Sequence, residues 1–134
     1  STATCPWGDA PEGGCRYANV FDQSAAAGID SPLAPVACDD GAASVTAVGS
    51  YATNAFGLHD MTGNVWEWTQ DCYQMPSPAA PLDGSPVSEG ECTRRSVKGG
   101  SWVTGITRQR PTFRGRDPED RASIVFGFRV ARDL

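Results

Sequence analysis

The sequence predicts a loop-rich domain with few helices or strands. Fifteen glycines and ten prolines among 134 residues interrupt most segments before a regular element can extend. Periodic segments are few and short, and no helix is strongly indicated. A chain of this length forms at most one domain. These observations disfavour a helical bundle and a doubly wound sheet.

Charge argues against nucleic-acid binding, and hydropathy argues against a membrane span. The net charge of −5 argues against general nucleic-acid binding. No run of about 18 apolar residues is present, so we expect no membrane span. Ten of the eleven basic residues lie in the last third of the chain, whereas acids dominate earlier. We expect most of this asymmetry to reflect pairing between the two parts; a basic groove for an anionic ligand is the alternative.

Five cysteines in a small acidic chain indicate an oxidising compartment, which is periplasmic or secreted. Cys15 and Cys38 flank one Pro/Ala/Ser-rich loop, and Cys72 and Cys92 flank another. We predict a disulfide at the base of each loop, worth about 3 kcal/mol apiece. Cys5 is left over, either paired outside this chain or buried. Zinc is disfavoured, because CxxC spacing is absent and the chain has one histidine.

The remaining elements are predicted from local pattern. Residues 44–57 are expected to form a strand followed by an irregular loop. Residues 96–103 predict a strand broken by a glycine pair, where a backbone or ligand approaches closely. The alternation in 124–132, IVFGFRVAR, predicts a terminal core strand. Residues 104–122 are irregular and rich in arginine, and Trp7 is the expected anchor of the N-terminal loop.

The segment Gly57–Asp71, GLHDMTGNVWEWTQD, combines oxygen donors, a turn and large apolar groups. Asp60 and Glu67 are hard oxygen donors. Gly63 and Asn64 suit a turn with positive φ or a close backbone approach. The two tryptophans of the WEW motif fall on one strand face, with the glutamate on the other. Such a turn is a candidate calcium site, since Ca²⁺ takes about six to eight oxygens. The alternative is a buried tryptophan ladder beside solvated acids.

A second pair of acids stands in CDDG, residues 38–41. Adjacent carboxylates of this kind are commonly solvated. Beside Asn19, they are also suited to complete another cage of oxygens.

Several motifs together carry a resemblance to a known family. They are PWGD (6–9), YANVFD (17–22), CDDG (38–41), VGSYATNAFGLHDMTGNVWEWTQD (48–71), KGGSW (98–102) and GFRVAR (127–132). In this order they resemble the C-terminal half of the formylglycine-generating enzyme (sulfatase-modifying factor) superfamily, essentially from end to end. The resemblance implies an α+β domain of the C-type-lectin-like kind with little regular secondary structure.

The resemblance also implies a missing partner. Residues 1–134 correspond to the C-terminal part of a single family domain, whose N-terminal half does not occur in this chain. We expect that half to be a second chain or a cleaved segment. The chain begins at Ser1 with no visible signal peptide, which is typical of a processed product or a fragment.

Two structural calcium sites are implied by the family. In one, the side chains of Asp60 and Glu67 and the main-chain carbonyls of Gly63 and Val65 resemble the ligands. In the other, the matching ligands are the side chains of Asn19 and Asp40 and the carbonyls of Val20 and Ala42. An ion that binds only the native arrangement would stabilise a loop-rich domain.

The family's copper ligands do not carry over. The formylglycine-generating enzyme binds copper(I) through two cysteines just after its GGS motif, and thiolates suit that ion. The matching positions here hold Thr104 and approximately Gln109, and no cysteine follows Cys92. We therefore expect no copper and no oxidation of cysteine to formylglycine.

The resemblance places a ligand pocket around the GGSW segment. Ser101 and Trp102 are expected to line it, with Thr104 next to them. The arginines behind it favour a small peptide-like or anionic ligand, because one guanidinium group can donate two parallel hydrogen bonds to a carboxylate or phosphate. These arginines are Arg108, Arg110, Arg114 and Arg116. The alternative is that these arginines pair with the nearby acids Asp117, Glu119 and Asp120.

Two functions from different classes fit the sequence. The first is an oxidative tailoring enzyme of the periplasm, because a family branch without the copper cysteines acts in maturation of the siderophore pyoverdine. The second is a non-catalytic ligand-binding module of the diversified-receptor kind found on the lectin-like fold. No catalytic residue is identified, and His59 is expected to be a surface or packing residue.

Overall fold

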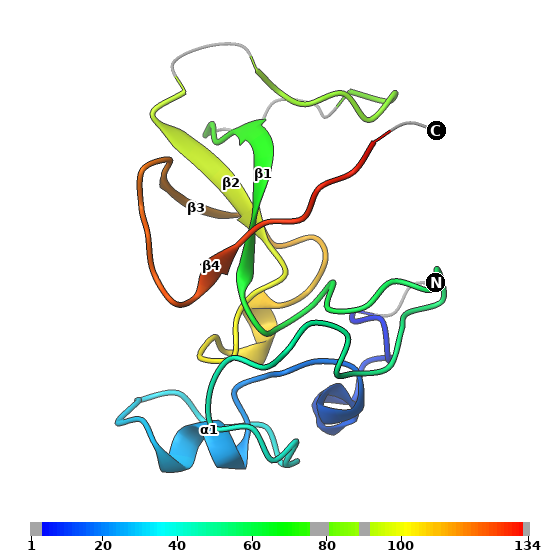
Figure 1. Ribbon diagram of the computed structural model, residues 1–134, viewed down its shortest axis with the longest axis vertical. Helices are drawn as coiled ribbons and strands as arrows, with labels where there is room; N and C mark the ends of the chain where they lie inside the picture. The colour runs from blue at the N-terminus through cyan, green and yellow to red at the C-terminus, as the bar shows by residue number, and fades with distance from the viewer. Residues whose placement is uncertain (1–3, 76–80, 89–91, 133–134) are drawn as a thin grey trace.

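The computed structural model describes residues 4–75, 81–88 and 92–132. Its helical elements are η1 (Pro11–Arg16), α1 (Gln23–Ala27) and η2 (Ile106–Arg108), and its strands are β1 (Trp66–Cys72), β2 (Arg94–Lys98), β3 (Gly115–Pro118) and β4 (Phe126–Gly127). The strands form one sheet in the order β3-β2-β1-β4 (Figure 1). The predicted α+β fold with little regular secondary structure is therefore confirmed.

The sheet is antiparallel except at one edge. β1 pairs antiparallel with β2, and β2 with β3, whereas the short β4 runs parallel to β1. The strand predicted over 96–103 is broken at the glycine pair, but it does not resume: β2 covers Arg94–Lys98, and residues 99–103 are in no strand. A Cβ on Gly100 would stand 2.5 Å from Cγ of Gln109, so this position has no room for a side chain.

α1 is a helix that the sequence did not indicate. Asp22 caps its N-terminus by accepting a hydrogen bond from the backbone N–H of Ala25 at 3.0 Å, and Gly28 follows its last residue. The helix has five residues. Such a length is too short to show helical periodicity in the sequence.

Two buried clusters form the core. The first contains Ala18, Val20 and Val36, and Trp7 packs against it together with the two cysteines of the first disulfide. The second contains Phe21, Ala25 and Trp102. Trp7 thus anchors the N-terminal loop as predicted.

Both predicted disulfides are present. Cys15 is bonded to Cys38, and Cys72 to Cys92, while Cys5 is a free, half-buried thiol. Burial raises the pKa of the Cys5 thiol, and the nearby charge of Asp9 raises it further. Cys5 is therefore less disposed to ionise than an exposed cysteine.

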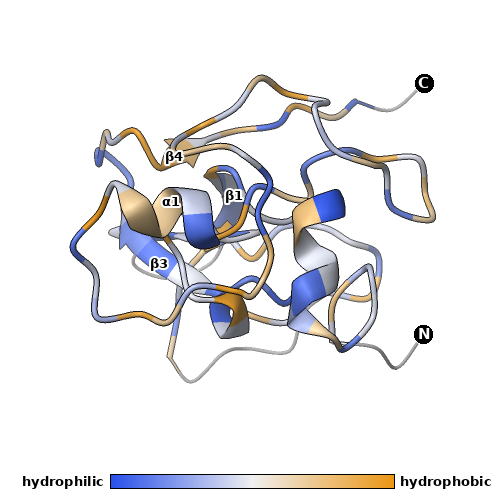
Figure 2. Cartoon of the chain, turned by 90° about the horizontal axis from the view of Figure 1, so that it is seen from below, coloured by the Kyte–Doolittle hydropathy of each residue, from blue (hydrophilic) through white to orange (hydrophobic). Residues whose placement is uncertain are grey.

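Three expectations about strands need correction. Residues 44–57 contain no strand. The irregular stretch 104–122 contains η2 and β3. Of residues 124–132, just Phe126–Gly127 are in a strand, and the flanking apolar side chains are exposed rather than in the core: Ile124 is 75%, Phe128 77% and Val130 85% exposed. Figure 2 shows hydrophobic segments at the periphery, including some near β4, as well as inside.

Candidate functional site

The Gly63-Asn64 turn packs directly against Asn19. The backbone N–H of Asn64 donates to the carbonyl of Asn19 at 2.7 Å. Gly63 has φ +75°, and a Cβ there would clash with the same carbonyl. The predicted reasons for this turn, positive φ and close backbone approach, are both confirmed. Because Asn19 and Gly63 belong to different predicted oxygen sets, the turn connects the two sets.

The acids near Asn19 form a compact cluster. Asp22, Asp39 and Asp40 have carboxylate oxygens within 4.8 Å of one another. Asp22 is fully buried and accepts the backbone N–H of Asp40 at 2.6 Å, while Asp39 is exposed. The sequence identified Asp40 as a ligand but not Asp22, which becomes a candidate once its burial beside Asp40 is known.

Asp40 is held by two donors, yet burial disfavours its charge. Its carboxylate accepts the backbone N–H of Ala42 at 2.7 Å and the hydroxyl of Tyr51 at 3.0 Å. Burial raises the pKa of Asp40, and the charge of Asp22 adds to the effect. Burial likewise raises the pKa of Tyr51 to about 12. A cation here would offset the repulsion between the acids.

The second predicted oxygen set is built around Asp60. Asp60 has φ +55°, which is unusual for a residue with a side chain. One carboxylate oxygen accepts the backbone N–H of Gly49 at 2.7 Å. Glu67, from the same set, is bound by Arg129 with contacts of 2.6 to 3.2 Å. The guanidinium of Arg129 also donates to the carbonyls of His59 and Asp60 at 3.0 and 3.2 Å.

Each oxygen set contains one buried oxygen that fits a hard cation. Oδ1 of Asn19 and Oδ1 of Asp60 are buried and have no hydrogen-bond partner, one in each predicted set. A buried oxygen without a partner costs free energy that a bound ion would recover. Oxygen ligands of this kind suit Ca²⁺. Glu67 fits less simply, since its carboxylate already binds Arg129.

A groove of about 670 Å³ lies over the second set. Its walls come from the loop around Val48 and Leu58 and from the segment around Phe128, and its polar lining includes Asp60 and Glu67. His59 also lines it, with Nδ1 at 2.7 Å from the carbonyl of Tyr51. The groove therefore combines an apolar rim with a charged interior.

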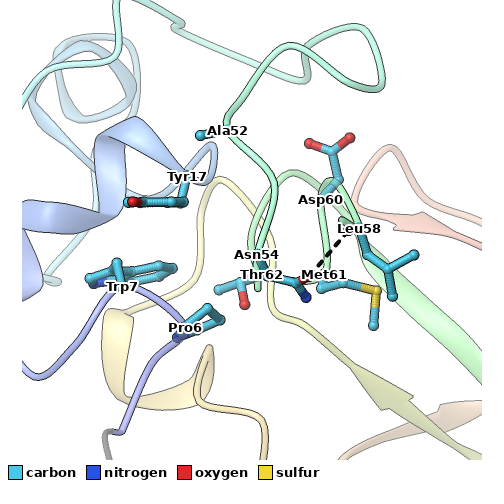
Figure 3. A pocket seen from close by; sticks show the side chains of 9 residues that line it. All are labelled: Pro6, Trp7, Tyr17, Ala52, Asn54, Leu58, Asp60, Met61 and Thr62. Atoms are coloured by element: carbon cyan, nitrogen blue, oxygen red, sulfur yellow. Dashed lines mark hydrogen bonds between the residues drawn. The ribbon is translucent and has the colours of Figure 1, made fainter. Parts of the chain in front are cut away.

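A second, much smaller pocket shares Leu58 and Asp60 with this groove. It measures about 10 Å³, enough for roughly one water. Figure 3 shows the stacked rings of Trp7 and Tyr17 at one end, with 6.4 Å between centroids, and the Asp60 carboxylate pointing away from them. This pocket is too small for an organic substrate.

The residues predicted to line a ligand pocket are largely buried. Ser101, Trp102 and Thr104 are at most 8% exposed, and Trp102 is part of the core. None of them lines either pocket described above. The hydroxyls of Ser101 and Thr104 lie 2.7 Å apart, and the amide of Gln109 donates to the carbonyls of both residues, at 3.0 and 2.9 Å. The two positions that match the copper cysteines thus belong to a neutral hydrogen-bond network.

Three of the four predicted arginines contact aromatic rings. Arg114 and Arg116 lie 5.4 and 5.3 Å from the centroid of Tyr73, and Arg108 lies 5.9 Å from that of Phe113. Arg110 is exposed. Sequence reasoning missed Tyr73, which follows β1 directly and is distant from these arginines in the chain.

The nearby acids pair with other arginines. Asp117 contacts Arg121 at 2.9 Å, and Glu119 contacts Arg95 at 3.3 Å. A ligand site at the four arginines stays a prediction.

Comparison with known proteins identifies the family to which this fold and site belong. The whole chain, residues 1–134, matches the family described as the sulfatase-modifying factor enzyme 1-like domain, and the chain belongs to this family. It is 32% identical to the formylglycine-generating enzyme of Mycobacterium tuberculosis over 99% of this chain and 46% of the relative. It is 35% identical to hercynine oxygenase of Mycolicibacterium smegmatis over 65% of this chain and 22% of the relative.

A solved structure supports the same assignment. PvdO from Pseudomonas aeruginosa superposes with a TM-score of 0.69 and 30% identity, over 85% of this chain and 38% of that one. This chain spans less than half the length of the curated relatives it matches, 46% of the M. tuberculosis enzyme and 22% of hercynine oxygenase. Among the described helices, none has the length and apolar character that crossing a membrane requires.

Proposed function

We propose that this chain is part of an oxidative tailoring enzyme of the formylglycine-generating enzyme family that acts in maturation of the siderophore pyoverdine. The observation that carries the proposal is the Thr104–Gln109 network, which stands where the family's copper thiolates are expected. Membership of a family with an oxygenase relative and the likeness to PvdO support it. A ligand of peptide-like or anionic character fits the arginines that contact Tyr73.

Calcium is proposed as a structural ion. The ligands would be Asn19 and Asp40, with the carbonyls of Val20 and Ala42, in one site, and Asp60, Gly63, Val65 and Glu67 in the other. Asp22 joins the first set because one of its carboxylate oxygens lies within 4.8 Å of a carboxylate oxygen of Asp40. The two buried oxygens without partners support this assignment. The ion would hold loops together and is given no step in the chemistry.

Compartment and partner complete the proposal. Two disulfides favour the periplasm or an extracellular location. The lengths of the relatives favour a complementary N-terminal half, supplied by a longer polypeptide or by a second chain. That half is expected to complete the substrate site, because Ser101 and Trp102 are buried and line neither of the two pockets described above.

A deletion strain and the purified complete protein test the function. The strain is expected to accumulate a siderophore precursor, and the protein to convert that precursor while consuming dioxygen. If the strain made normal siderophore and the protein bound the precursor unchanged, the tailoring function would be wrong. The non-catalytic ligand-binding module would then be the better description.

A further inference from the structure

The two disulfides lie in opposite electrostatic surroundings. Nη1 of Arg95 contacts Sγ of Cys72 at 3.8 Å, and Arg95 lies directly across from Cys72 in the β1–β2 pair. At the other disulfide, a carboxylate oxygen of Asp22 lies 3.6 Å from Sγ of Cys15. One bond therefore has a guanidinium against its sulfur, whereas the other has a carboxylate.

The charge of Arg95 is only partly offset by acids. Its Nε contacts Glu119 at 3.3 Å, but the two side chains are 31% and 58% exposed, so water screens this ion pair. Asp117 lies across from Arg95 on β3, yet its carboxylate contacts Arg121 instead. The guanidinium thus keeps a positive charge next to Cys72.

The two sulfurs of the Cys72–Cys92 bond differ in their access to solvent. Cys72 is 1% exposed, whereas Cys92 is half-buried. An incoming thiolate therefore reaches Cys92, and Cys72 is the sulfur that leaves. A thiolate leaves faster when a neighbouring cation stabilises it, and Arg95 stands in that position.

The Cys15–Cys38 bond has better access but an opposing charge. Both of its cysteines are half-buried, so access alone would make this bond the easier one to reduce. The fully buried carboxylate of Asp22 beside Cys15 repels an incoming thiolate as well as a departing one. Access and charge thus predict opposite orders of reduction for the two bonds.

We propose that Cys92 is a thiol-exchange site, at which a dithiol reductant opens the Cys72–Cys92 bond while Cys15–Cys38 stays closed. A thiolate of the reductant attacks Sγ of Cys92 and forms a mixed disulfide with it, and Cys72 leaves as a thiolate beside Arg95. The second thiol of the reductant then closes on the first and releases Cys92. The protein bond gains two electrons and two protons, and the dithiol is oxidised to a disulfide.

Two hydrogen bonds make the opening reversible. The backbone N–H of Cys72 donates to the carbonyl of Val87 at 2.8 Å, and the backbone N–H of Val87 donates to the carboxylate of Asp71 at 2.9 Å. They keep Val87, which precedes Cys92 by five residues, at the end of β1 when the disulfide is open.

Opening the bond bears on the proposed function at one point. Tyr73 follows Cys72 directly, and its ring contacts Arg114 and Arg116. The disulfide is therefore the covalent tie next to arginines that the proposed function assigns to the ligand. This consequence rests on the proposed function, whereas the exchange at Cys92 does not.

Selective reduction tests the exchange site. The folded complete protein is treated with dithiothreitol for increasing times and trapped with N-ethylmaleimide, and its cysteine peptides are quantified by mass spectrometry. We expect Cys72–Cys92 to open at least about fivefold faster than Cys15–Cys38. With glutathione as the probe, the mixed disulfide is expected on Cys92. The proposal would be overturned by a Cys72–Cys92 bond that opens no faster than Cys15–Cys38, or by an adduct on Cys72.

Two variants of opposite sign separate charge from structure. Arg95→Gln removes the cation and should slow opening of Cys72–Cys92 at least about threefold, while Glu119→Gln removes its counter-charge and should speed opening by about twofold. Both variants break the same ion pair, so a structural effect would shift both rates in one direction. Arg94→Gln, at the exposed neighbouring arginine, is the control and should change the rate by less than about 1.5-fold.

Shifts of the same sign in Arg95→Gln and Glu119→Gln, or an unchanged rate in Arg95→Gln, would also overturn the proposal. None of these measurements requires turnover. Loss of siderophore conversion with intact selectivity of reduction would therefore count against the proposed function alone.

Discussion

Arg129 donates to both carboxylate oxygens of Glu67 across 62 residues of sequence, with its closest contact at 2.6 Å. The same guanidinium reaches the carbonyls of His59 and Asp60. This arrangement ties the segment after β4 to β1 and to the turn that holds the second oxygen set. It also places a positive charge against Glu67, a carboxylate that the sequence predicts as a calcium ligand.

Replacing Arg129 should therefore strengthen calcium binding at the second set. Arg129→Ala removes a like charge next to the ion, and we expect the affinity of that site to rise by at least about threefold. Isothermal titration calorimetry of the calcium-stripped protein measures the change, with Asp60→Asn as the variant that loses the site. An affinity that falls in Arg129→Ala would show that the guanidinium supports the site instead.

The raised pKa of Asp40 predicts a pH dependence that calcium reverses. Since the folded state holds the Asp40 proton more tightly than the unfolded state, this group's contribution to stability is present below its unfolded pKa of about 3.8 and is lost as pH rises through the raised folded pKa. Bound calcium favours the carboxylate, so the slope should reverse when the ion is added.

Denaturant unfolding between pH 3 and 7, in chelator and in calcium, measures this effect. Asp40→Asn removes the titrating group, so the difference between the wild type and this variant isolates its contribution. An identical slope in chelator and in calcium would argue against an ion at Asp40.

Local features of the fold could be predicted from the sequence. The loops between cysteines predicted both disulfides. The Gly63-Asn64 pair predicted a turn, because few residues tolerate a backbone with positive φ. The glycine pair marked the break in the strand predicted over 96–103, although no strand follows it. Each of these signals depends on residues that are close together in the chain.

Features that depend on distant residues were missed. Nothing in the sequence shows that Arg129 meets Glu67 or that Tyr73 lies against two arginines. The alternation after residue 124 was interpreted as a core strand, because alternation reports which face a strand is suited to bury and not whether a covering element is present. α1 was missed for a local reason instead: its five residues are too few for helical periodicity, and Asp22 caps it.

Gly63 should be far less tolerant of alanine than a glycine with the same backbone elsewhere. Gly63→Ala combines positive φ with a clash against the carbonyl of Asn19, and we expect a loss above about 3 kcal/mol. Gly84→Ala is the matched control, with φ +79° and nothing within 4 Å, and should cost about 1 kcal/mol. Chemical denaturation measures both. Equal losses would mean that φ alone requires glycine at the turn.

Gln109 should stabilise the GGSW loop through its amide donors. Gln109→Met keeps the volume but leaves the carbonyls of Ser101 and Thr104 without these partners, which we expect to cost about 2 kcal/mol. Its other amide atom, Oε1, already lacks a partner, so no further hydrogen bond is lost. Thr107→Ala, on the exposed side of the same turn, is the control and should be nearly neutral. Hydrogen exchange at the backbone amides of residues 101–105 should quicken in Gln109→Met and not in the control. If unfolding stability and exchange were both unchanged, the network would not hold this loop in place.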